Sequence, residues 1–321
     1  MPELSFISFT LKMIGSKEGR EMLQAVRETE RYAVWKARQV LEESGVDKEM
    51  ERKPFHEFPD PSFAKLIGDI MEAEGLARWE ADRLKWLSTS GNPPPVTNRY
   101  LVSFKPVIDR VYATLPDSLM SGERFMARSS AGAESRAVFG RFLDNLGYDR
   151  LRELVVKWAN IPPGSLVVDV GAGIGLSSIT ILRLVPGSRV IAVDPYQPNL
   201  EVAKSYAEVL GLSDRLEVRV GRGEEIHRVV KSADFAVMIN ILHWCSDPLT
   251  ILNSVREVTP NALLTQGVLD TKLSLVLAPL TYLLGSSILP TMEQLNDWIK
   301  TAGWRIEKRM RHPAPAFILK A

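Results

Sequence analysis

A run of glycines followed at a fixed distance by an acidic residue is the feature of this 321-residue sequence that most clearly points to chemistry. Gly171, Gly173 and Gly175 follow the β-branched run 166–170, and a helical pattern begins at residue 176. A glycine turn between a strand and a helix lets the backbone approach a ligand closely. Asp194 stands 19 positions after Gly175, at the end of the next predicted strand. In dinucleotide-binding folds a carboxylate at about this spacing accepts from a ribose hydroxyl.

The spacing of these glycines differs from the one that dinucleotide-binding folds require. A dinucleotide fingerprint, G-x-G-x-x-G, needs glycine at position 176 after Gly171 and Gly173, and that position is Leu176. The spacing found is G-x-G-x-G, which disfavours a nicotinamide enzyme. A tight strand-to-helix connection without a ligand is the alternative interpretation of the loop.

A second group of polar residues follows the fourth predicted strand of this region. His243 lies in the sequence Leu242-His243 and is followed by Asp247 after three residues. An imidazole with an ordinary pKa near 6.5 suits a general base at neutral pH. The alternative is that His243 is a packed residue that lines the pocket. Asp247, with Pro248 after it, is expected to be the N-cap of the next helix.

Short strands alternate with helices from residue 161 onward. Such alternation predicts a parallel sheet covered on both faces, and the closing helix and two strands predict an antiparallel edge. The expected strands are 166–170, 189–194, 216–220, 235–240, 262–269, 304–310 and 316–319, and the expected helices are 176–184, 199–211, 224–230, 249–258 and 292–302.

The first 160 residues are rich in balanced charges and carry helical periodicity. A long helix is predicted from Ser16, as N-cap, to Gly45, as the stop. Further helical patterns cover 61–87, with a break at Gly75, and 100–115 and 134–158. We therefore expect an all-α domain over 1–160 and an α/β domain over 161–321.

Composition excludes several classes of function. Lys+Arg 40 against Asp+Glu 39 gives a net charge of +1, so no overall basic field attracts nucleic acid or an anionic membrane. Cys245 is the single cysteine, and four scattered histidines form no metal-ligand pattern, so we expect a reducing cytoplasm and no metal.

The uncharged segment 273–292 has the length of a membrane span, but Pro279, Gly285 and Pro290 interrupt it. We expect it to be either a lid over an apolar ligand or ordinary core.

Together, the glycine loop with Asp169 and Asp194 resembles the cofactor motif of class I S-adenosylmethionine-dependent methyltransferases over residues 161–321. The resemblance implies a Rossmann-like, mostly parallel seven-stranded sheet with an antiparallel edge strand. It also implies S-adenosyl-L-methionine as cofactor and S-adenosyl-L-homocysteine as product. The cofactor-binding residues expected on this basis are Asp169, Gly171, Ala172, Gly173, Gly175, Asp194, Pro195, Gly221, Arg222, Asn240 and Ile241.

The Leu242-His243 stretch with Asp247 is similar to small-molecule O-methyltransferases that carry a helical N-terminal dimerisation domain, and also to quinone C-methyltransferases. The resemblance to the first group implies O-methylation of an apolar, phenol- or quinol-like hydroxyl with His243 as general base, and a homodimer formed through the helical domain. Methylation of carbon in a quinone- or lipid-like acceptor, methylation of RNA or protein, and a non-catalytic cofactor-binding module remain alternatives. The chain lacks the Asn/Asp-Pro-Pro-aromatic motif of nucleobase and glutamine methylases after this strand.

Overall fold

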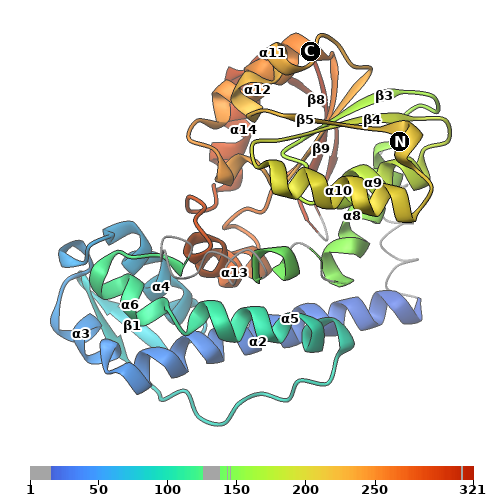
Figure 1. Ribbon diagram of the computed structural model, residues 1–321. Coiled ribbons are helices and arrows are strands. Elements are labelled where there is room, and N and C mark those ends of the chain that lie inside the picture. Colours follow the sequence, from blue (N-terminus) through green and yellow to red (C-terminus); the bar gives the residue numbers. More distant parts are fainter. Residues whose placement is uncertain (1–15, 126–137, 143, 145, 312–313) are drawn as a thin grey trace. The chain divides into compact units, whose positions relative to one another are not determined.

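The computed structural model describes residues 16–125, 138–142, 144, 146–311 and 314–321 of the chain, which form two compact units (Figure 1). The helical unit comprises the described residues up to 144 together with Leu269–Leu289. The sheet unit comprises Leu146–Val268 and Pro290–Ala321. The single boundary predicted at residue 160 thus differs from the division in the structure. Residues 146–159, a helix before the first strand of the sheet, belong to the sheet unit. Residues 269–289, at and after the end of the fifth predicted strand, belong to the helical unit.

The helical unit is built around helix α2 (Lys17–Ser44). Its predicted ends are confirmed: the Ser16 hydroxyl accepts a 2.9 Å hydrogen bond from the Gly19 N–H, and Gly45 ends the helix with φ 74°. Helix α5 (Arg99–Tyr112) packs against α2. The other helices of this unit that precede residue 126 are α3 (Val46–Arg52), η1 (Phe55–Glu57), α4 (Pro61–Ala73), α5 (Arg99–Tyr112) and α6 (Leu115–Ser121).

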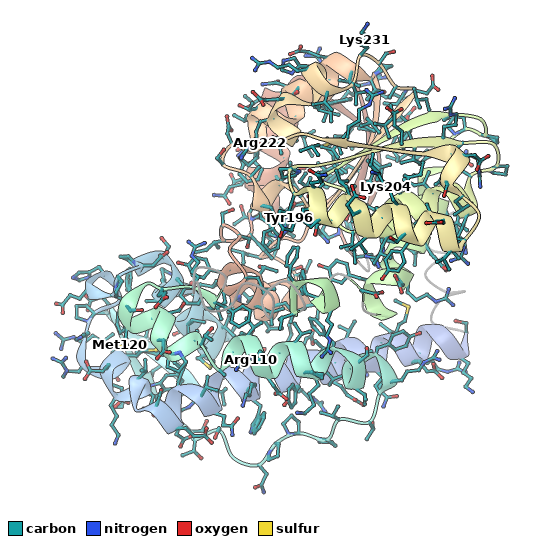
Figure 2. The ribbon with its side chains drawn as sticks, viewed as in Figure 1. Arg110, Met120, Tyr196, Lys204, Arg222 and Lys231 are labelled. Atoms are coloured by element: carbon teal, nitrogen blue, oxygen red, sulfur yellow. The ribbon has the colours of Figure 1, made fainter. Side chains whose placement is uncertain are left out.

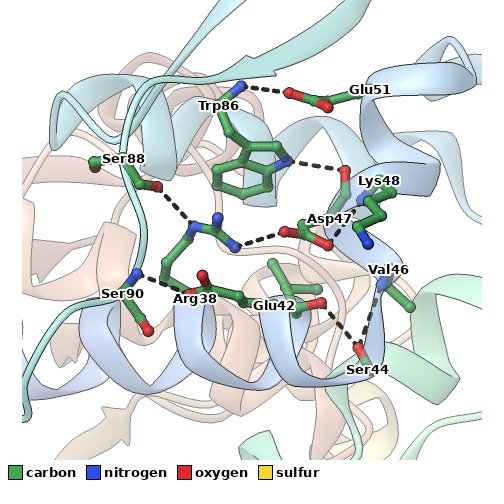
Figure 3. Close-up of polar contacts among 11 residues, drawn as sticks. Arg38, Glu42, Ser44, Val46, Asp47, Lys48, Glu51, Trp86, Ser88 and Ser90 are labelled. Carbon is green, nitrogen blue, oxygen red and sulfur yellow. Dashed lines mark hydrogen bonds and ion pairs between the residues drawn. The ribbon is translucent and has the colours of Figure 1, made fainter.

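A buried arginine ties α2 to the elements that follow it (Figure 3). The Arg38 side chain is 3% exposed and forms a 3.2 Å ion pair with Asp47 of α3. Its Nε donates to the Ser88 carbonyl oxygen, and its guanidinium lies 4.0 Å from the Trp86 ring centroid. The Trp86 indole N–H donates in turn to the Asp47 carbonyl oxygen at 2.9 Å. The charge of Arg38 is therefore both paired and stacked, as a buried cation requires.

The prediction of a helix over 61–87 is wrong in its second half. Helix α4 ends near Gly75, as the break predicted, but residues 77–86 form the antiparallel hairpin β1 (Ala77–Glu80) and β2 (Arg83–Trp86). Ala77 and Leu84 are buried while their strand neighbours are more exposed, which is the two-residue alternation of a strand. Each strand has only four residues, so its alternation in the sequence is too short to distinguish a strand from a continuation of the helical pattern before it.

The uncharged segment that begins at residue 273 contributes a core helix to the helical unit. Helix α13 (Lys272–Leu283) packs against α2, α4, α5 and α6, and Ala278, Leu280 and Leu283 are fully buried. The Tyr112 hydroxyl donates to the Val276 carbonyl oxygen at 2.7 Å. Of the two expectations for this segment, core packing is confirmed. No helix among the described residues is both long and apolar enough to cross a membrane.

The sheet unit has seven strands in the order β5-β4-β3-β6-β7-β9-β8. All neighbours pair in parallel except β9, which runs antiparallel to both β7 and β8. This confirms the predicted mostly parallel sheet with an antiparallel edge. The strands are β3 (Leu166–Val170), β4 (Arg189–Asp194), β5 (Leu216–Val220), β6 (Phe235–Ile239), β7 (Asn261–Thr265), β8 (Arg305–Met310) and β9 (Ala316–Lys320).

Helices lie on both sides of this sheet (Figure 1). On one face, α11 (Ile226–Val229), α12 (Pro248–Val258) and α14 (Met292–Thr301) bury a single apolar cluster against β3, β4, β6, β7 and β9. On the other, α9 (Leu176–Leu184) and α10 (Gln197–Val209) pack on β4, and α8 (Leu146–Ala159) packs beside α9. Because the parallel strands all end at one edge, the loops that follow them are brought together there.

Candidate functional site

The glycine loop connects β3 to α9 at the carboxyl edge of the sheet. Gly171, Gly173 and Gly175 all have left-handed backbone conformations, with φ of 71°, 54° and 81°. The N–H groups of Gly171 and Ala172 both donate to the Val193 carbonyl oxygen of β4, at 2.8 and 2.9 Å. The predicted loop is thus a tight turn bonded to the neighbouring strand, and glycine is required because residues with a Cβ rarely adopt such angles.

Two of these glycines also allow close packing across the loop. A Cβ added to Gly171 would lie 2.2 Å from Cδ1 of Ile241, and one added to Gly175 would lie 2.3 Å from Cβ of Ala203. Ile241 follows β6, and Ala203 belongs to α10. The loop after β3 is therefore held between the residues that follow β6 and the helix that follows β4.

Asp194 lies at the end of β4 and bonds directly to the glycine loop. Its Oδ2 accepts from the Gly173 N–H at 2.9 Å, and its Oδ1 accepts from the Tyr196 N–H at 2.9 Å and from the Asn199 side-chain amide at 3.3 Å. The side chain is buried, and burial raises its pKa above the ordinary value. Two separate sequence predictions, the loop and the acid, thus come together in one site.

Asp169 is fully enclosed beneath the loop. Its Oδ2 accepts a 2.6 Å hydrogen bond from the Ser178 hydroxyl in α9. Burial raises the pKa of Asp169 to about 6, and the nearby charge of Asp194 contributes in the same direction. The bond to Ser178 joins the end of β3 to α9, and it therefore helps to hold the loop between them in shape.

The turn after β5 carries the predicted residues Gly221 and Arg222. The Gly221 N–H donates to the Asp194 carbonyl oxygen at 3.2 Å, which brings this turn beside the end of β4. Arg222 is exposed and lies 3.5 Å from Glu224 in an ion pair. Figure 2 labels Arg222 together with Tyr196, an exposed aromatic residue after β4 that the sequence analysis did not single out. Pro195, between Asp194 and Tyr196, is exposed.

Asn240 joins the loops that follow β6 and β7. Its backbone is left-handed, with φ 52°, and its N–H donates to the Thr265 carbonyl oxygen. The Asn240 Oδ1 accepts from the Gly267 N–H at 2.8 Å, and the same amide hydrogen-bonds with the Tyr148 hydroxyl of α8. Tyr148 was not anticipated because nothing in the sequence indicates that α8 ends up beside the loop after β6.

His243 is buried in the short helix η6 (Leu242–Trp244), and its partners include a side chain that nothing in the sequence indicated. Its Nδ1 lies 3.0 Å from Nε2 of Gln266, the first residue after β7. Burial lowers the pKa of His243 to about 4. At neutral pH the imidazole is therefore uncharged and a weak base.

The remaining polar residues near η6 have structural roles. The Asp247 carboxylate accepts from the Leu249 N–H at 3.0 Å and caps α12, with Pro248 at the first helical position, as predicted. Cys245 is partly buried, and burial raises the pKa of its thiol to about 12, so the thiolate is scarce. Within the described part of the chain, His, Cys, Asp and Glu side chains form no group of three or more suited to a metal ion.

Comparisons with known proteins agree with this geometry. Residues 167–261 match the sequence model of a family described as "Methyltransferase domain". A release factor glutamine methyltransferase from Chlorobaculum tepidum is 27% identical over 123 residues, which cover 38% of this chain and 42% of that protein. The chain thus spans less than half of the length of the curated relative that it matches.

Solved structures resemble the chain over most of its length. A CurJ carbon methyltransferase has a TM-score of 0.69 at 12% identity, covering 99% of this chain and 97% of its own. A family 2 O-methyltransferase from Planctomyces limnophilus, in complex with apigenin, has a TM-score of 0.58 at 16% identity, with 94% and 95% covered. The mitomycin 7-O-methyltransferase MmcR has a TM-score of 0.54 at 18% identity, with 94% and 96% covered. At such identities the likeness concerns the fold.

Proposed function

We propose that this chain, whose sheet unit is a class I S-adenosylmethionine-dependent methyltransferase domain, transfers a methyl group from S-adenosylmethionine to an oxygen atom of an apolar small molecule. The single observation that carries the proposal is the hydrogen bond between Asp194 and Gly173. It joins a buried carboxylate to a glycine loop at the sheet edge where folds of this kind bind nucleotides.

The residues at this edge fit the proposed cofactor. A carboxylate offers about four lone-pair positions. The protein donors Gly173, Tyr196 and Asn199 account for three bonds to Asp194, which leaves about one lone-pair position for a ribose hydroxyl. We assign the adenine side of the cofactor to Tyr196 and to the turn at Gly221 and Arg222, and the methionine side to the loop 171–175.

When bound, S-adenosylmethionine supplies an electrophilic methyl group on a sulfonium, and S-adenosylhomocysteine is the product. Displacement at that carbon requires the nucleophile to be aligned with the breaking bond, so positioning matters more than acid strength. On this proposal the loop 171–175 and Asp194 hold the donor side, and the residues that follow β6 face the reacting centre. A base is needed only where the acceptor must lose a proton during the reaction.

Carbon is the second candidate for the methylated atom, and the state of His243 favours it. The ring is buried, uncharged at neutral pH and bonded at Nδ1 to Gln266, so it is poorly suited to take a proton from a hydroxyl. An acceptor carbon that is already nucleophilic, such as that of an enolate, forms the new carbon–carbon bond without the loss of a proton and needs no base at this position.

Methylation of protein or RNA is less well supported. The curated relative acts on glutamine of a release factor according to its name, but residues 240–243 here read Asn-Ile-Leu-His and lack the motif that grips a planar amide. The near-zero net charge provides no general attraction for RNA. We keep as further proposals a homodimer formed through the helical unit and a cytoplasmic location, the latter on the basis of the single cysteine.

Calorimetric titration with S-adenosylmethionine, S-adenosylhomocysteine and NADH tests the proposed cofactor. We expect binding of both adenosyl ligands, no binding of NADH, and loss of adenosyl binding in Asp194→Ala. Asp214→Ala, an exposed acid in the 3-10 turn Ser213–Arg215, is the matched control and should bind as wild type does. No adenosyl binding by the folded wild-type protein would overturn the proposal. Product analysis with phenol and 1,3-dicarbonyl acceptors then distinguishes oxygen from carbon.

A further inference from the structure

Strand β5 lies at one end of the seven-stranded sheet, so one of its edges has no neighbouring strand among the described residues. The Gly221 N–H, directly after this strand, donates to the Asp194 carbonyl oxygen of β4. Backbone groups point alternately to the two sides of a strand, so the odd-numbered residues of β5 also face β4. The N–H and C=O groups that point to the open edge therefore belong to residues 216, 218 and 220.

The side chains of β5 divide into an apolar face and a charged face. Leu216 and Val218 pack on the small apolar cluster that α10 forms with the sheet. Val220 lies on the same face by the alternation of the strand and is 57% exposed. Glu217 and Arg219 lie on the opposite face, where Arg219 Nε is 2.7 Å from Glu217 Oε1. The open edge thus carries an unburied valine on one side and an ion pair on the other.

The two charges make β5 complementary to itself. Charged side chains on an open edge ordinarily oppose pairing with another strand, but here they have opposite signs and stand two residues apart. In a two-fold antiparallel pair with Val218 on the axis, Glu217 lies opposite Arg219 of the second copy and Leu216 lies opposite Val220. An axis at Glu217 would place two carboxylates opposite each other, and an axis at Arg219 would place two guanidinium groups so. Charge therefore selects one register.

We propose that β5 is an interface between two copies of this chain, in which the two β5 strands pair antiparallel about a two-fold axis at Val218. The sheet then continues from one copy into the other. In this register residues 216, 218 and 220, whose backbone groups point to the open edge, exchange N–H···O bonds with residues 220, 218 and 216 of the second copy. Such a two-fold contact is closed, because each copy uses the same surface.

The charged face is able to form ion pairs between the copies without losing those within each chain. Arg219 uses Nε for Glu217 and Nη1 for the Val229 carbonyl oxygen, which lies at 2.6 Å. Nη2 of the same guanidinium can then donate to Glu217 of the second copy. Five paired residues form a small interface, so the association should be reversible at micromolar concentrations. This contact is separate from the dimer proposed through the helical unit, and it requires no cofactor.

Sedimentation equilibrium of the full-length protein without cofactor tests the interface first. We expect the average mass to rise from that of one chain to that of two between low-micromolar and sub-millimolar concentrations. The mass of a single chain throughout this range would overturn the inference. Because cofactor is absent from the cell, this result is independent of the calorimetric test of the proposed function.

Reversal of single charges separates this contact from any other. Arg219→Glu and Glu217→Arg each place like charges opposite each other in both cross-strand pairs, so each should weaken self-association at least about tenfold. A mixture of the two variants restores opposite charges in both pairs, so it should form a heterodimer about as tightly as the wild type associates. Lys308→Glu is the matched control, since Lys308 is an exposed cation on β8, the opposite edge strand, and this variant should associate as wild type does.

Recovery upon mixing cannot result from misfolding or from a dimer through the helical unit. If the mixed variants associate no more tightly than either variant alone, the inference fails. Val218→Pro provides a second test, because proline removes the N–H at the axis and is tolerated on an edge strand where that N–H points away from the neighbouring strand. We expect folded Val218→Pro to remain a single chain, and wild-type association of this variant would show that the dimer uses another surface.

Discussion

Asp194 Oδ2 accepts a 2.9 Å hydrogen bond from the Gly173 N–H, which fastens the end of β4 to the loop after β3. The acid is thus part of the architecture of the loop as well as a candidate ligand for the cofactor. Its side chain serves three donors from two segments of the chain, so its removal affects both stability and binding.

Asp194→Ala should therefore lower the free energy of unfolding as well as abolish cofactor binding. A fully buried donor left without a partner costs about 1–3 kcal/mol; the donors to Asp194 are partly buried or exposed, so we expect a loss of about 1 kcal/mol in urea denaturation. Asp194→Asn retains one acceptor oxygen and should lose less stability. Equal stability of wild type and Asp194→Ala would show that the Gly173 and Tyr196 N–H groups find other partners.

Gly171→Ala should destabilise the protein more than the backbone angle alone explains. Gly164→Ala is the matched control, since Gly164 has a similar φ of 78° and open space where a Cβ would lie. We expect about 1–2 kcal/mol for the control and about 1–3 kcal/mol more for Gly171→Ala, because the new methyl group meets Ile241. Adding Ile241→Ala should recover part of the additional loss in a double-mutant cycle, and additive effects would contradict the clash.

The raised pKa of Asp169 predicts a specific dependence of stability on pH. Its folded-state pKa of about 6 exceeds the ordinary value of 3.8, so the folded state binds the proton more tightly than the unfolded chain. The contribution of Asp169 to stability should thus fall as pH rises from about 4 to 6, by about 3 kcal/mol at most. The difference in unfolding free energy between wild type and Asp169→Asn, measured from pH 4 to 8, isolates this contribution. A flat difference would contradict the prediction.

His243→Ala should slow turnover less than removal of a general base does. Loss of a base costs about 10²- to 10⁴-fold, whereas we expect a loss below about 10²-fold once an acceptor is identified. Because burial lowers the pKa of His243 to about 4, the wild-type rate should show no ionisation near pH 6.5 that disappears in this variant. A loss of turnover above about 10³-fold, together with the disappearance of such an ionisation, would show that His243 acts as a general base.

The sheet unit was predictable from sequence because its signals are local. Leu166–Val170 and Leu176–Leu184 have the predicted limits, since a β-branched run, three glycines and an apolar helix follow each other directly. Asp194 was placed by its position at a strand end. The two ends of α2, at Ser16 and Gly45, were likewise predicted, because capping residues mark helix ends in the sequence itself.

The partners of His243 and Asn240 could not be predicted in the same way. Gln266 and Tyr148 lie 23 positions after His243 and 92 positions before Asn240, and only the order of the strands and the packing of α8 bring them close. The hairpin at 77–86 was missed for a different reason. Its fold depends on Trp79 packing over Gly68, where a Cβ would lie 2.2 Å from the indole, and no local pattern reports such a contact.

Because α13 is encoded after β7, the order of synthesis constrains how the helical unit reaches its final form. Phe63 stacks on Tyr282 with ring centroids 4.0 Å apart, and Tyr112 donates to the carbonyl of Val276, which is synthesised 164 positions later. On the ribosome, about 150 further residues are synthesised after the helices before residue 126 until α13, which packs against four of them, is complete. Completion of this unit therefore follows the synthesis of residues 146–268 of the sheet unit, and chains interrupted before residue 283 are expected to expose an unfilled apolar core to chaperones and proteases.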